Sequence, residues 1–367
     1  MAIIAMPQTQ DAASLEEKAK AAQAAYETKD YARALVLVQA AISTPAFERL
    51  PASDRQNFFY NESCIYALLG QKAMAIKALR TAVSLGYSNV AQIAIDPDLD
   101  AIRNDAEFKS WLSELKAKFG LKPLEWVHDK NESPFPLHMD SANNPKLKTL
   151  RTEFGIDAVV ANARDDYEQL RRIADWTSNR WEHSATQNAS NNDPLTILRE
   201  AKAGGQFICM NYAVVLGGTA SALGLPSRLL GLLPKETETR HDAHSVAEVW
   251  LSSRGKWVLA DGQWGQVAEV DGVPLNAIEL QDALVKDKTI QCSKPVSCRP
   301  WLGFIQQYLY FFKITRDERW FENFKADQLV LMPVGATAPK SMNGNTNVFA
   351  GARYTSNPDI FYAAPPK

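Results

Sequence analysis

Near the middle of the 367-residue chain runs the segment GGQFICMNYAVVLGGTASAL, residues 204–223. Its opening glycines predict a turn. From Cys209 onward the residues are small or apolar for about four helical turns, which predicts a buried helix. Cys209 therefore stands at or near the start of that helix. The unpaired N–H groups and the positive dipole end at a helix N-terminus favour a thiolate, and one such N–H can also stabilise an oxyanion.

Three strands are predicted downstream of this helix. Residues 227–233 (SRLLGLL) form an apolar run, and residues 244–251 (HSVAEVWL) and 256–261 (KWVLAD) are rich in strand formers. The turn residues SSRG separate the last two runs, a pattern that is typical of a β-hairpin. His244 stands near one end of the hairpin and Asp261 near the other.

The length of the hairpin loop controls whether these two side chains meet. A four-residue loop at 252–255 pairs Leu251 with Lys256. It also places Asp261 diagonally across from His244 on one face, within reach of the imidazole. A loop of odd length puts the two side chains on opposite faces of the sheet. The predicted contact therefore requires an even loop.

Cys209, His244 and Asp261 are the residue types that a thiol nucleophile needs. A free thiol is mostly protonated at neutral pH, so a neighbouring imidazole has to take its proton. A carboxylate behind the imidazole fixes its tautomer and stabilises the imidazolium. Alone, Cys209 could be structural and Asp261 a turn residue; the ordered combination favours catalysis. A metal pair of His241 and His244 is disfavoured, because strand positions three apart point to opposite faces.

The motifs and their order resemble those of the transglutaminase-like (papain-type) cysteine enzymes. They read GQFICMNYA around Cys209, GLPSR up to Arg228, HSVAEVW from His244 and WVLAD up to Asp261. The resemblance covers roughly residues 170–265. It implies an α+β papain-like fold with an antiparallel sheet. It also implies attack of the thiol on an amide or ester carbonyl through an acyl-enzyme, with water or an amine as the acceptor.

Two further points follow from this resemblance. Many members of the family have proline after the catalytic aspartate, where Gly262 stands here. The family also uses an upstream aromatic or amide side chain beside the oxyanion, for which the candidates are Trp176, Trp181 and Gln206. From the strand pattern itself, Glu248 shares the face of His244. We expect Glu248 to be a buried partner of Arg228 rather than a second polar group in the cleft.

The first hundred residues are rich in Ala, Leu, Lys and Gln at helical spacing. Residues 30–42 resemble residues 70–83, with three matched pairs: Ala34 and Ala75, Val38 and Leu79, Ala41 and Ala82. This pattern is similar to the tetratricopeptide repeat, a pair of antiparallel helices per unit. One interpretation is a peptide-binding surface for a protein partner. We favour a packing or docking module, because about three repeats are needed for independent stability.

The predicted domain organisation has three parts. Residues 12–117 form tetratricopeptide-like repeats with a helical cap, and residues 118–144, which lose periodicity and gain proline and asparagine, form a linker. Residues 145–367 form the catalytic domain, with a core at about 165–270. The remaining C-terminal extension carries no motif, and we expect it to wall the cleft.

Composition excludes several classes of function. The net charge is −2 and aromatic residues are not interleaved with basic clusters, so no nucleic-acid partner is expected. No stretch approaches the ~18 apolar residues of a membrane span. No second Cys/His pair stands at ligand spacing near Cys292 and Cys298, so we predict no metal, and no cofactor motif is present.

The cysteines bear on the compartment. Cys64 is predicted to be a small buried hydrophobe. Cys292 and Cys298 are six residues apart, which suits a disulfide, although two free loop thiols remain the alternative. A disulfide would imply an oxidising compartment, periplasmic or secreted. The apolar residues 1–7 fit either the stub of a signal peptide or an ordinary terminus, and a cytoplasmic location is the alternative.

Two hypotheses about function remain. The first is a thiol peptidase or amidase that acts on peptide or protein substrates, favoured over an amine-transferring cross-linker. The second is a scaffold that binds a protein partner through its helical repeats and has lost turnover. The presence of all three catalytic residue types favours the enzyme.

Overall fold

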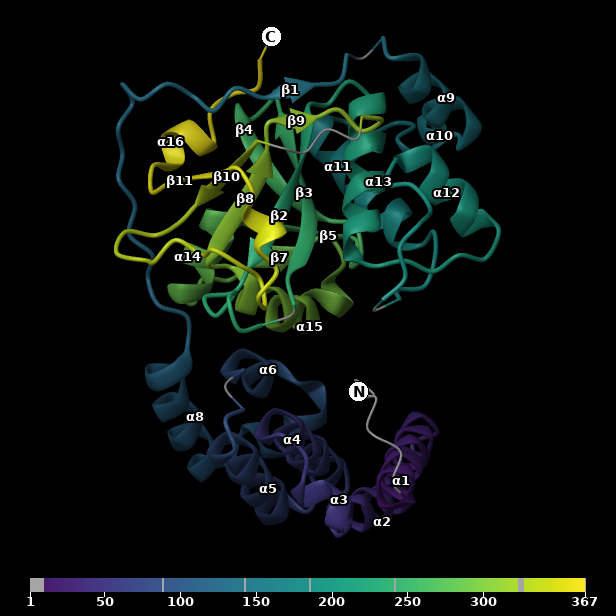
Figure 1. The fold of residues 1–367 in the computed structure, drawn as a ribbon, viewed down its shortest axis with the longest axis vertical. Coiled ribbons are helices and arrows are strands. Elements are labelled where there is room, and N and C mark those ends of the chain that lie inside the picture. Colours follow the sequence, from purple (N-terminus) through teal and green to yellow (C-terminus); the bar gives the residue numbers. More distant parts are fainter. Residues whose placement is uncertain are drawn as a thin grey trace. The chain divides into compact units, whose positions relative to one another are not determined.

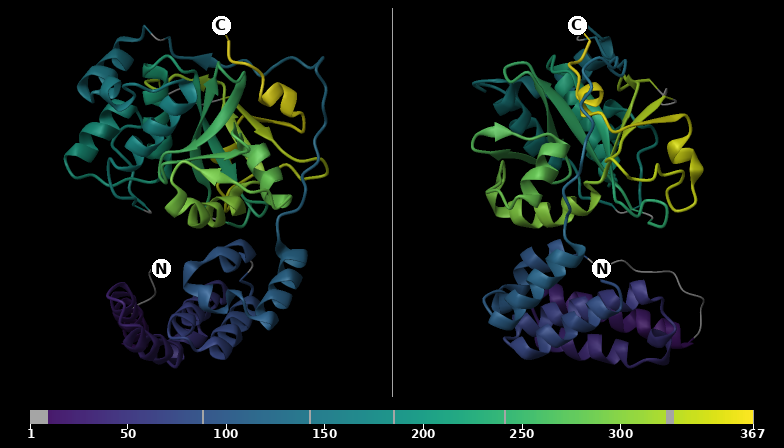
Figure 2. Two further views of the ribbon diagram at one scale, coloured as in Figure 1. Left: turned by 180° about the vertical axis from the view of Figure 1, so that it is seen from behind. Right: turned by 90° about the vertical axis from the view of Figure 1, so that its left-hand side faces the viewer.

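The computed structural model describes residues 10–87, 89–141, 143–184, 186–240, 242–322 and 327–366. The chain divides into two compact units after Gly120. The first unit is helical and the second is built around a sheet (Figures 1 and 2). The predicted fold class, an all-α module followed by an α+β domain with a mostly antiparallel sheet, is confirmed. Within the described ranges, no helix has the length and apolar character that a membrane crossing needs.

Paired helices make up the first unit. Helix α1 (Gln10–Glu27) packs against α2 (Tyr31–Ile42), and α4 (Ala52–Leu68) packs against α5 (Lys72–Ser84). The matched alanines of the two similar segments are fully buried, and their small size lets the helices approach closely. The tetratricopeptide assignment stays a prediction. The other helices of this unit are α3 (Pro45–Glu48), α6 (Val90–Ile95), η1 (Pro97–Leu99), α7 (Asp100–Arg103) and α8 (Ala106–Phe119).

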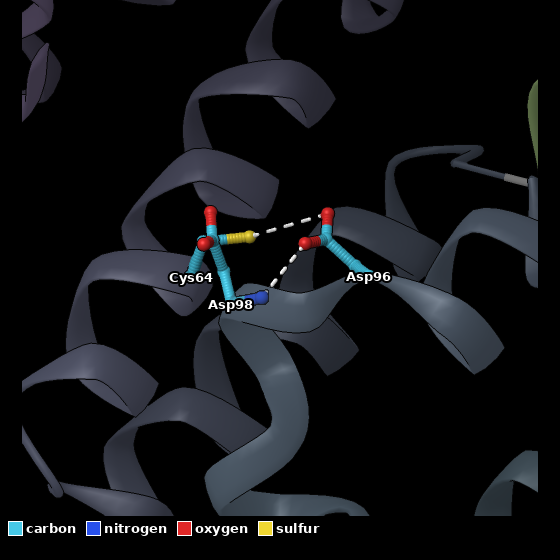
Figure 3. A group of neighbouring side chains, drawn as sticks. All are labelled: Cys64, Asp96 and Asp98. Atoms are coloured by element: carbon cyan, nitrogen blue, oxygen red, sulfur yellow. Dashed lines mark hydrogen bonds between the residues drawn. The ribbon is translucent and has the colours of Figure 1, made fainter. Parts of the chain in front are cut away.

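A buried polar cluster joins these helices (Figure 3). The thiol of Cys64 lies 3.9 Å from an Asp96 carboxylate oxygen, and Asp98 lies beside them. The hydroxyl of Tyr60 donates to Asp96 and that of Tyr26 to Asp98. Burial raises the pKa of the Cys64 thiol. Because protein donors already occupy the carboxylates and the thiol is held neutral, the cluster fits a structural hydrogen-bond group better than a set of metal ligands.

The second unit holds a nine-stranded sheet among its described residues, in the order β11-β10-β8-β2-β3-β4-β5-β6, with β7 also paired to β5. All neighbours are antiparallel except β10 and β11. A separate parallel pair joins β1 and β9. The strands are β1 (His138–Met139), β2 (Ser227–Leu233), β3 (His244–Leu251), β4 (Lys256–Asp261), β5 (Gln266–Val270), β6 (Val273–Pro274), β7 (Gln291–Cys292), β8 (Phe311–Thr315), β9 (Asp317–Glu318), β10 (Gln328–Leu331) and β11 (Ala352–Thr355).

Helices cover both faces of this sheet (Figure 1). Residues of β3, β4 and β5 pack on one face against α11 and α13, and the alternate residues of these strands pack on the other against α14, α15 and α16. Helices α9 and α12 pack beside α13. The helices of this unit are α9 (Pro145–Glu153), α10 (Ile156–Val159), α11 (Asp166–Ser178), α12 (Pro194–Lys202), α13 (Cys209–Ala222), α14 (Ala277–Val285), α15 (Pro295–Ile305), η2 (Gln306–Tyr308), η3 (Thr346–Phe349) and α16 (Pro358–Phe361).

The hairpin of β3 and β4 has the predicted register. Leu251 pairs with Lys256 across a loop of four residues, 252–255. Arg228 and Glu248 form the expected buried ion pair at 2.6 Å, with both side chains 0% exposed. The register and the pair are therefore confirmed.

The segment predicted as a linker lies along the second unit. The backbone N–H of Val127 donates to Ser356, that of Phe135 to Ile360 and that of His138 to Arg316. Phe135 is buried in the core on the α14 face. The segment has no helical or strand periodicity, yet its backbone is bonded at several points to residues far along the chain. We call residues 121–144 the strap.

Candidate active site

Cys209 is the first residue of α13, as the sequence predicts. The helix is held tightly in place, since all residues from Asn211 to Ala222 are buried. Two glycines permit this packing. A Cβ at Gly217 would lie 2.2 Å from the Trp320 ring, and one at Gly218 would lie 2.6 Å from Pro194. The thiol therefore sits on the first turn of a rigid helix that packs against β2 and β3.

His244 and Asp261 meet at the start of β3 and the end of β4. The His244 Nε2 atom lies 2.8 Å from Asp261 Oδ2, and the side chains are 1% and 0% exposed. This contact leaves Nδ1 of the imidazole for another partner. The Phe304 ring packs edge-on against the imidazole with centroids 4.9 Å apart, and Tyr308 lies at 6.0 Å. These rings keep water from the imidazole.

The His244 side chain and the backbone of Ser245 lie close enough to the thiol of Cys209 to act on its pKa. Burial acts to raise the pKa of the thiol, but the hydrogen bond and the charge of His244 outweigh it, so the pKa lies below its usual value. Burial likewise acts to lower the pKa of His244. The charge and hydrogen bond of Asp261, together with Cys209, outweigh that effect and raise it. The two shifts favour a thiolate beside an imidazolium.

The carboxylate of Asp261 has a donor on every side. Oδ1 accepts the backbone N–H groups of Gln263 at 3.0 Å and Trp264 at 3.2 Å. Oδ2 faces His244 and also accepts the indole N–H of Trp301 at 2.8 Å. Hydrogen bonds to the ionised form offset the cost of burying a charge.

The packing around Gly262 explains why glycine stands here in place of the proline of the family motif. A Cβ at this position would lie 2.8 Å from the backbone oxygen of Tyr212 and 3.2 Å from Thr177. The end of β4 therefore passes directly against the first turn of α13. This close approach brings Asp261 to the helix that carries Cys209.

The sequence model of the transglutaminase-like superfamily matches residues 156–262, from the start of α10 to one residue beyond Asp261. The chain contains a transglutaminase-like domain. A solved structure described as a putative cysteine protease from Cytophaga hutchinsonii has 16% identity and a TM-score of 0.27, covering 37% of this chain and 48% of that one. A putative protease from Parabacteroides distasonis has 17% identity and a TM-score of 0.23, covering 31% and 25%.

The matched part of the chain thus spans less than half the length of either structure. TM-scores this low support no comparison of the sites. No curated protein is significantly similar in sequence.

Three side chains of the transglutaminase-like domain are candidates for the group beside the oxyanion, and they differ in their surroundings. The indole nitrogen of Trp181 is buried and has no partner among the described residues. Its ring lies 4.1 Å from that of Tyr212, one turn beyond Cys209. Trp176 is half-buried beneath Arg180. Gln206 is exposed, and its amide donates to Glu182 at 3.2 Å. Only Trp181 keeps a buried N–H donor spare.

Sequence reasoning missed His183 and Trp301. His183 is bridged to Phe207, two residues before Cys209, and stacks on Tyr212 at 6.4 Å. Burial and the charge of His244 lower the pKa of His183, against an opposing effect of Asp261. This ring therefore lies near Cys209, His244 and Asp261, which we call the trio. Its position two residues after Trp181 was a usable signal. His241 lies outside the described residues.

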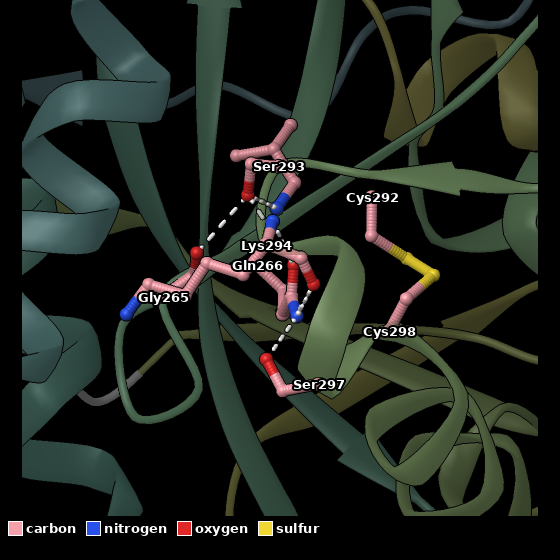
Figure 4. Close-up of a disulfide and its surroundings, with 8 residues drawn as sticks. Gly265, Gln266, Cys292, Ser293, Lys294, Ser297 and Cys298 are labelled. Atoms are coloured by element: carbon pink, nitrogen blue, oxygen red, sulfur yellow. Dashed lines mark hydrogen bonds between the residues drawn. A yellow bond between two sulfur atoms is a disulfide. The ribbon is translucent and has the colours of Figure 1, made fainter.

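A disulfide lies in the second unit, beyond the residues that match the superfamily (Figure 4). Cys292 on β7 is bonded to Cys298 on α15, with Cα atoms 5.4 Å apart. The amide of Gln266 donates to Lys294 at 3.0 Å and to Ser297 at 2.8 Å, which ties the start of α15 to β5. Cys64 and Cys209 are the free cysteines.

Proposed function

We propose that the transglutaminase-like domain is a thiol-dependent peptidase or amidase. Cys209 is the nucleophile, His244 is the base and Asp261 orients the imidazole. The observation that carries the proposal is the contact of His244 Nε2 with Asp261 Oδ2 at 2.8 Å, which leaves Nδ1 for the neighbouring thiol, whose pKa His244 lowers. This arrangement favours a thiolate with a proton donor beside it.

The reaction has two halves. The Cys209 thiolate attacks the carbonyl carbon of the substrate, and the electron pair of the C=O bond moves onto oxygen. The imidazolium of His244 protonates the departing amine as the C–N bond breaks, which leaves a thioester. The neutral imidazole then takes one proton from water, whose oxygen attacks the thioester. The C–S bond breaks, the thiolate reforms, and the carboxylic acid product leaves and loses its remaining proton to solvent.

We propose two donors for the developing oxyanion. One is the backbone N–H of Cys209 at the start of α13, where helix N–H groups have no intrahelical partner. The other is the spare indole N–H of Trp181. Donors held in place before the reaction cost no reorganisation when the negative charge forms.

Alkylation of Cys209 by iodoacetamide across a pH series tests the proposal without knowledge of the substrate. We expect labelling at Cys209 with a midpoint below that of an ordinary thiol, and a midpoint that rises to the ordinary value or above it in His244→Ala, because burial then raises the pKa of the thiol without opposition from the imidazole. Cys64→Ser is the matched control, because it removes the other free thiol, which is buried. This variant should alkylate like the wild type.

A fluorogenic peptide library provides the second half of the test. The wild type should release the amine leaving group from some members, and Cys209→Ala should release none. A thiol that titrates normally and is indifferent to His244 would contradict the enzyme assignment and favour the scaffold hypothesis.

A further inference from the structure

The indole of Trp301 lies behind the trio. Its Nε1–H donates to Asp261 Oδ2 at 2.8 Å, the same oxygen that faces His244. Trp301 is 0% exposed. It comes from α15, beyond residues 156–262 that match the superfamily, so no motif of the matched domain specifies it.

We infer that Trp301 is a positioning residue for the trio and acts through Asp261. The inference rests on the proposed function. The carboxylate can turn about its Cβ–Cγ bond, and the imidazole is correctly held only when Oδ2 points toward it. The backbone donors of Gln263 and Trp264 fix Oδ1. The indole fixes Oδ2, in a site closed to bulk solvent, since both side chains are 0% exposed.

The support behind Trp301 is rigid. Its ring belongs to the core cluster on the α14 face of the sheet. It stands three residues after Cys298, whose disulfide to Cys292 anchors the start of α15. A donor on a fixed element holds its partner more tightly than one on a loose segment.

The competing explanation is that Trp301 is only a large core side chain. Trp257 separates the two explanations, because it is as buried as Trp301 and its indole also donates a hydrogen bond, but it does not contact the trio. It is 1% exposed, and its indole donates at 2.8 Å, but to the backbone oxygen of Ala363. Its ring packs on Arg228, not on the trio. Trp257→Phe is therefore the matched control for Trp301→Phe.

The experiment measures the rate of Cys209 alkylation by iodoacetamide against pH, alongside thermal unfolding of each variant. Both phenylalanine variants should lose stability to a similar extent. Only Trp301→Phe should slow alkylation at neutral pH, by on the order of tenfold, and move its midpoint upward, because the imidazolium loses its aligned carboxylate. In an Asp261→Ala background, Trp301→Phe should cause no further slowing, since the route through Asp261 is gone.

The outcomes separate the inference from the proposed function. If Trp301→Phe alkylates with the wild-type rate and midpoint, or slows the Asp261→Ala protein equally, Trp301 is a core residue. The inference is then overturned while the proposed function stands. If the wild-type thiol itself titrates normally, both are overturned.

A second measurement needs no change at Trp301. In protein labelled with ¹⁵N-tryptophan, one indole N–H should be strongly protected from exchange and should titrate with the alkylation midpoint of Cys209. Asp261→Ala should remove both properties from that signal. If no protected indole follows the midpoint in the wild type, the inference is overturned.

Discussion

Cys209 and His244 shift each other's pKa in opposite directions, which gives two pH profiles of different shape. The pKa of Cys209 is lowered, so its thiolate persists to a lower pH than that of an ordinary thiol and is lost as the pH falls through the lowered value. The pKa of His244 is raised, so the imidazolium is lost as the pH rises through the raised value. Alkylation needs only the thiolate, whereas amide hydrolysis also needs the proton of the imidazolium.

We therefore predict that the alkylation rate rises once with pH to a plateau, and that the hydrolysis rate follows a bell-shaped pH profile. The acid limb of the bell should match the alkylation midpoint, as measured by stopped-flow alkylation and by peptide turnover in the same buffers. Hydrolysis that keeps its rate far above neutral pH, where the imidazole is neutral, would contradict the assignment of His244 as proton donor.

The spare donor of Trp181 allows binding of the oxyanion to be separated from activation of the thiol. Trp181→Phe keeps an aromatic ring against Tyr212 and removes the indole N–H together with some ring volume. We expect kcat for peptide hydrolysis to fall by about 10²–10³-fold, the usual cost of one oxyanion donor. Alkylation by iodoacetamide should be unchanged, because that reaction forms no oxyanion. Trp176→Phe is the control, and an equal loss in it would point to a packing effect.

Residues whose partners are close in sequence, or set by strand parity, were predictable. The place of Cys209 at a helix start and the approach of Asp261 to His244 follow from local pattern and loop length. Trp301 was not predictable, because its bond to Asp261 spans 40 residues and nothing in an aromatic run indicates which nitrogen meets a carboxylate. His183 depends in the same way on a bridge to Phe207, which lies 24 residues further along the chain, beyond α12.

At the scale of elements, the meeting of β4 and α13 depends on the absence of one side chain. Gly262→Ala introduces a Cβ that would lie 2.8 Å from the backbone oxygen of Tyr212. Backbone cannot move aside as a flexible side chain can, so the strand end and the helix start must separate. We expect alkylation of Cys209 to slow and the free energy of unfolding to fall by about 1–3 kcal/mol, the range for overpacking.

Gly231→Ala on β2 is the control for this change. An added Cβ there meets Lys313 at 3.6 Å, an ordinary contact. Its free energy of unfolding, from chemical denaturation, and its rate of Cys209 alkylation should both be close to those of the wild type. Equal damage in the two variants would show that the sheet tolerates no added carbon, rather than that Gly262 sets the spacing of the trio.

The elements themselves were predictable to different extents. The hairpin and α13 carry strong periodicity and clear turn residues, and both form as expected. The strap has no periodicity, because its backbone pairs with residues more than 170 positions away, such as Ser356 and Ile360. Local sequence pattern therefore could not predict how the strap packs.

For the whole molecule, the strap determines where the second unit can be separated from the first by truncation. A protein that begins at residue 121 keeps the strap and should fold with a Cys209 thiol as reactive as in the full chain. One that begins at residue 145 loses buried Phe135 and the backbone bonds of Val127 and His138. It should melt several degrees lower, since removal of a buried phenylalanine side chain alone costs about 3–5 kcal/mol.

Calorimetry of the two proteins checks this prediction, with alkylation of Cys209 as the functional readout. Equal melting temperatures would mean that the strap adds no stability, and the predicted linker boundary at 144 would then be the better one. Loss of reactivity in the protein that begins at residue 121 would mean that the helical unit contributes to the thiol site.

The strand order has a consequence for how the protein is made. One edge of β2 pairs with β3, which follows at once, but its other edge pairs with β8, which begins at Phe311. At about 5–20 residues per second, the ribosome needs roughly 4–16 seconds to deliver β8 after β2 has emerged. During that interval an apolar strand edge stands open, and the thiol, imidazole and carboxylate precede Trp301. We therefore expect the nascent chain to be prone to aggregation during that interval, and the bond of Trp301 to Asp261 to form only after residue 301 has emerged.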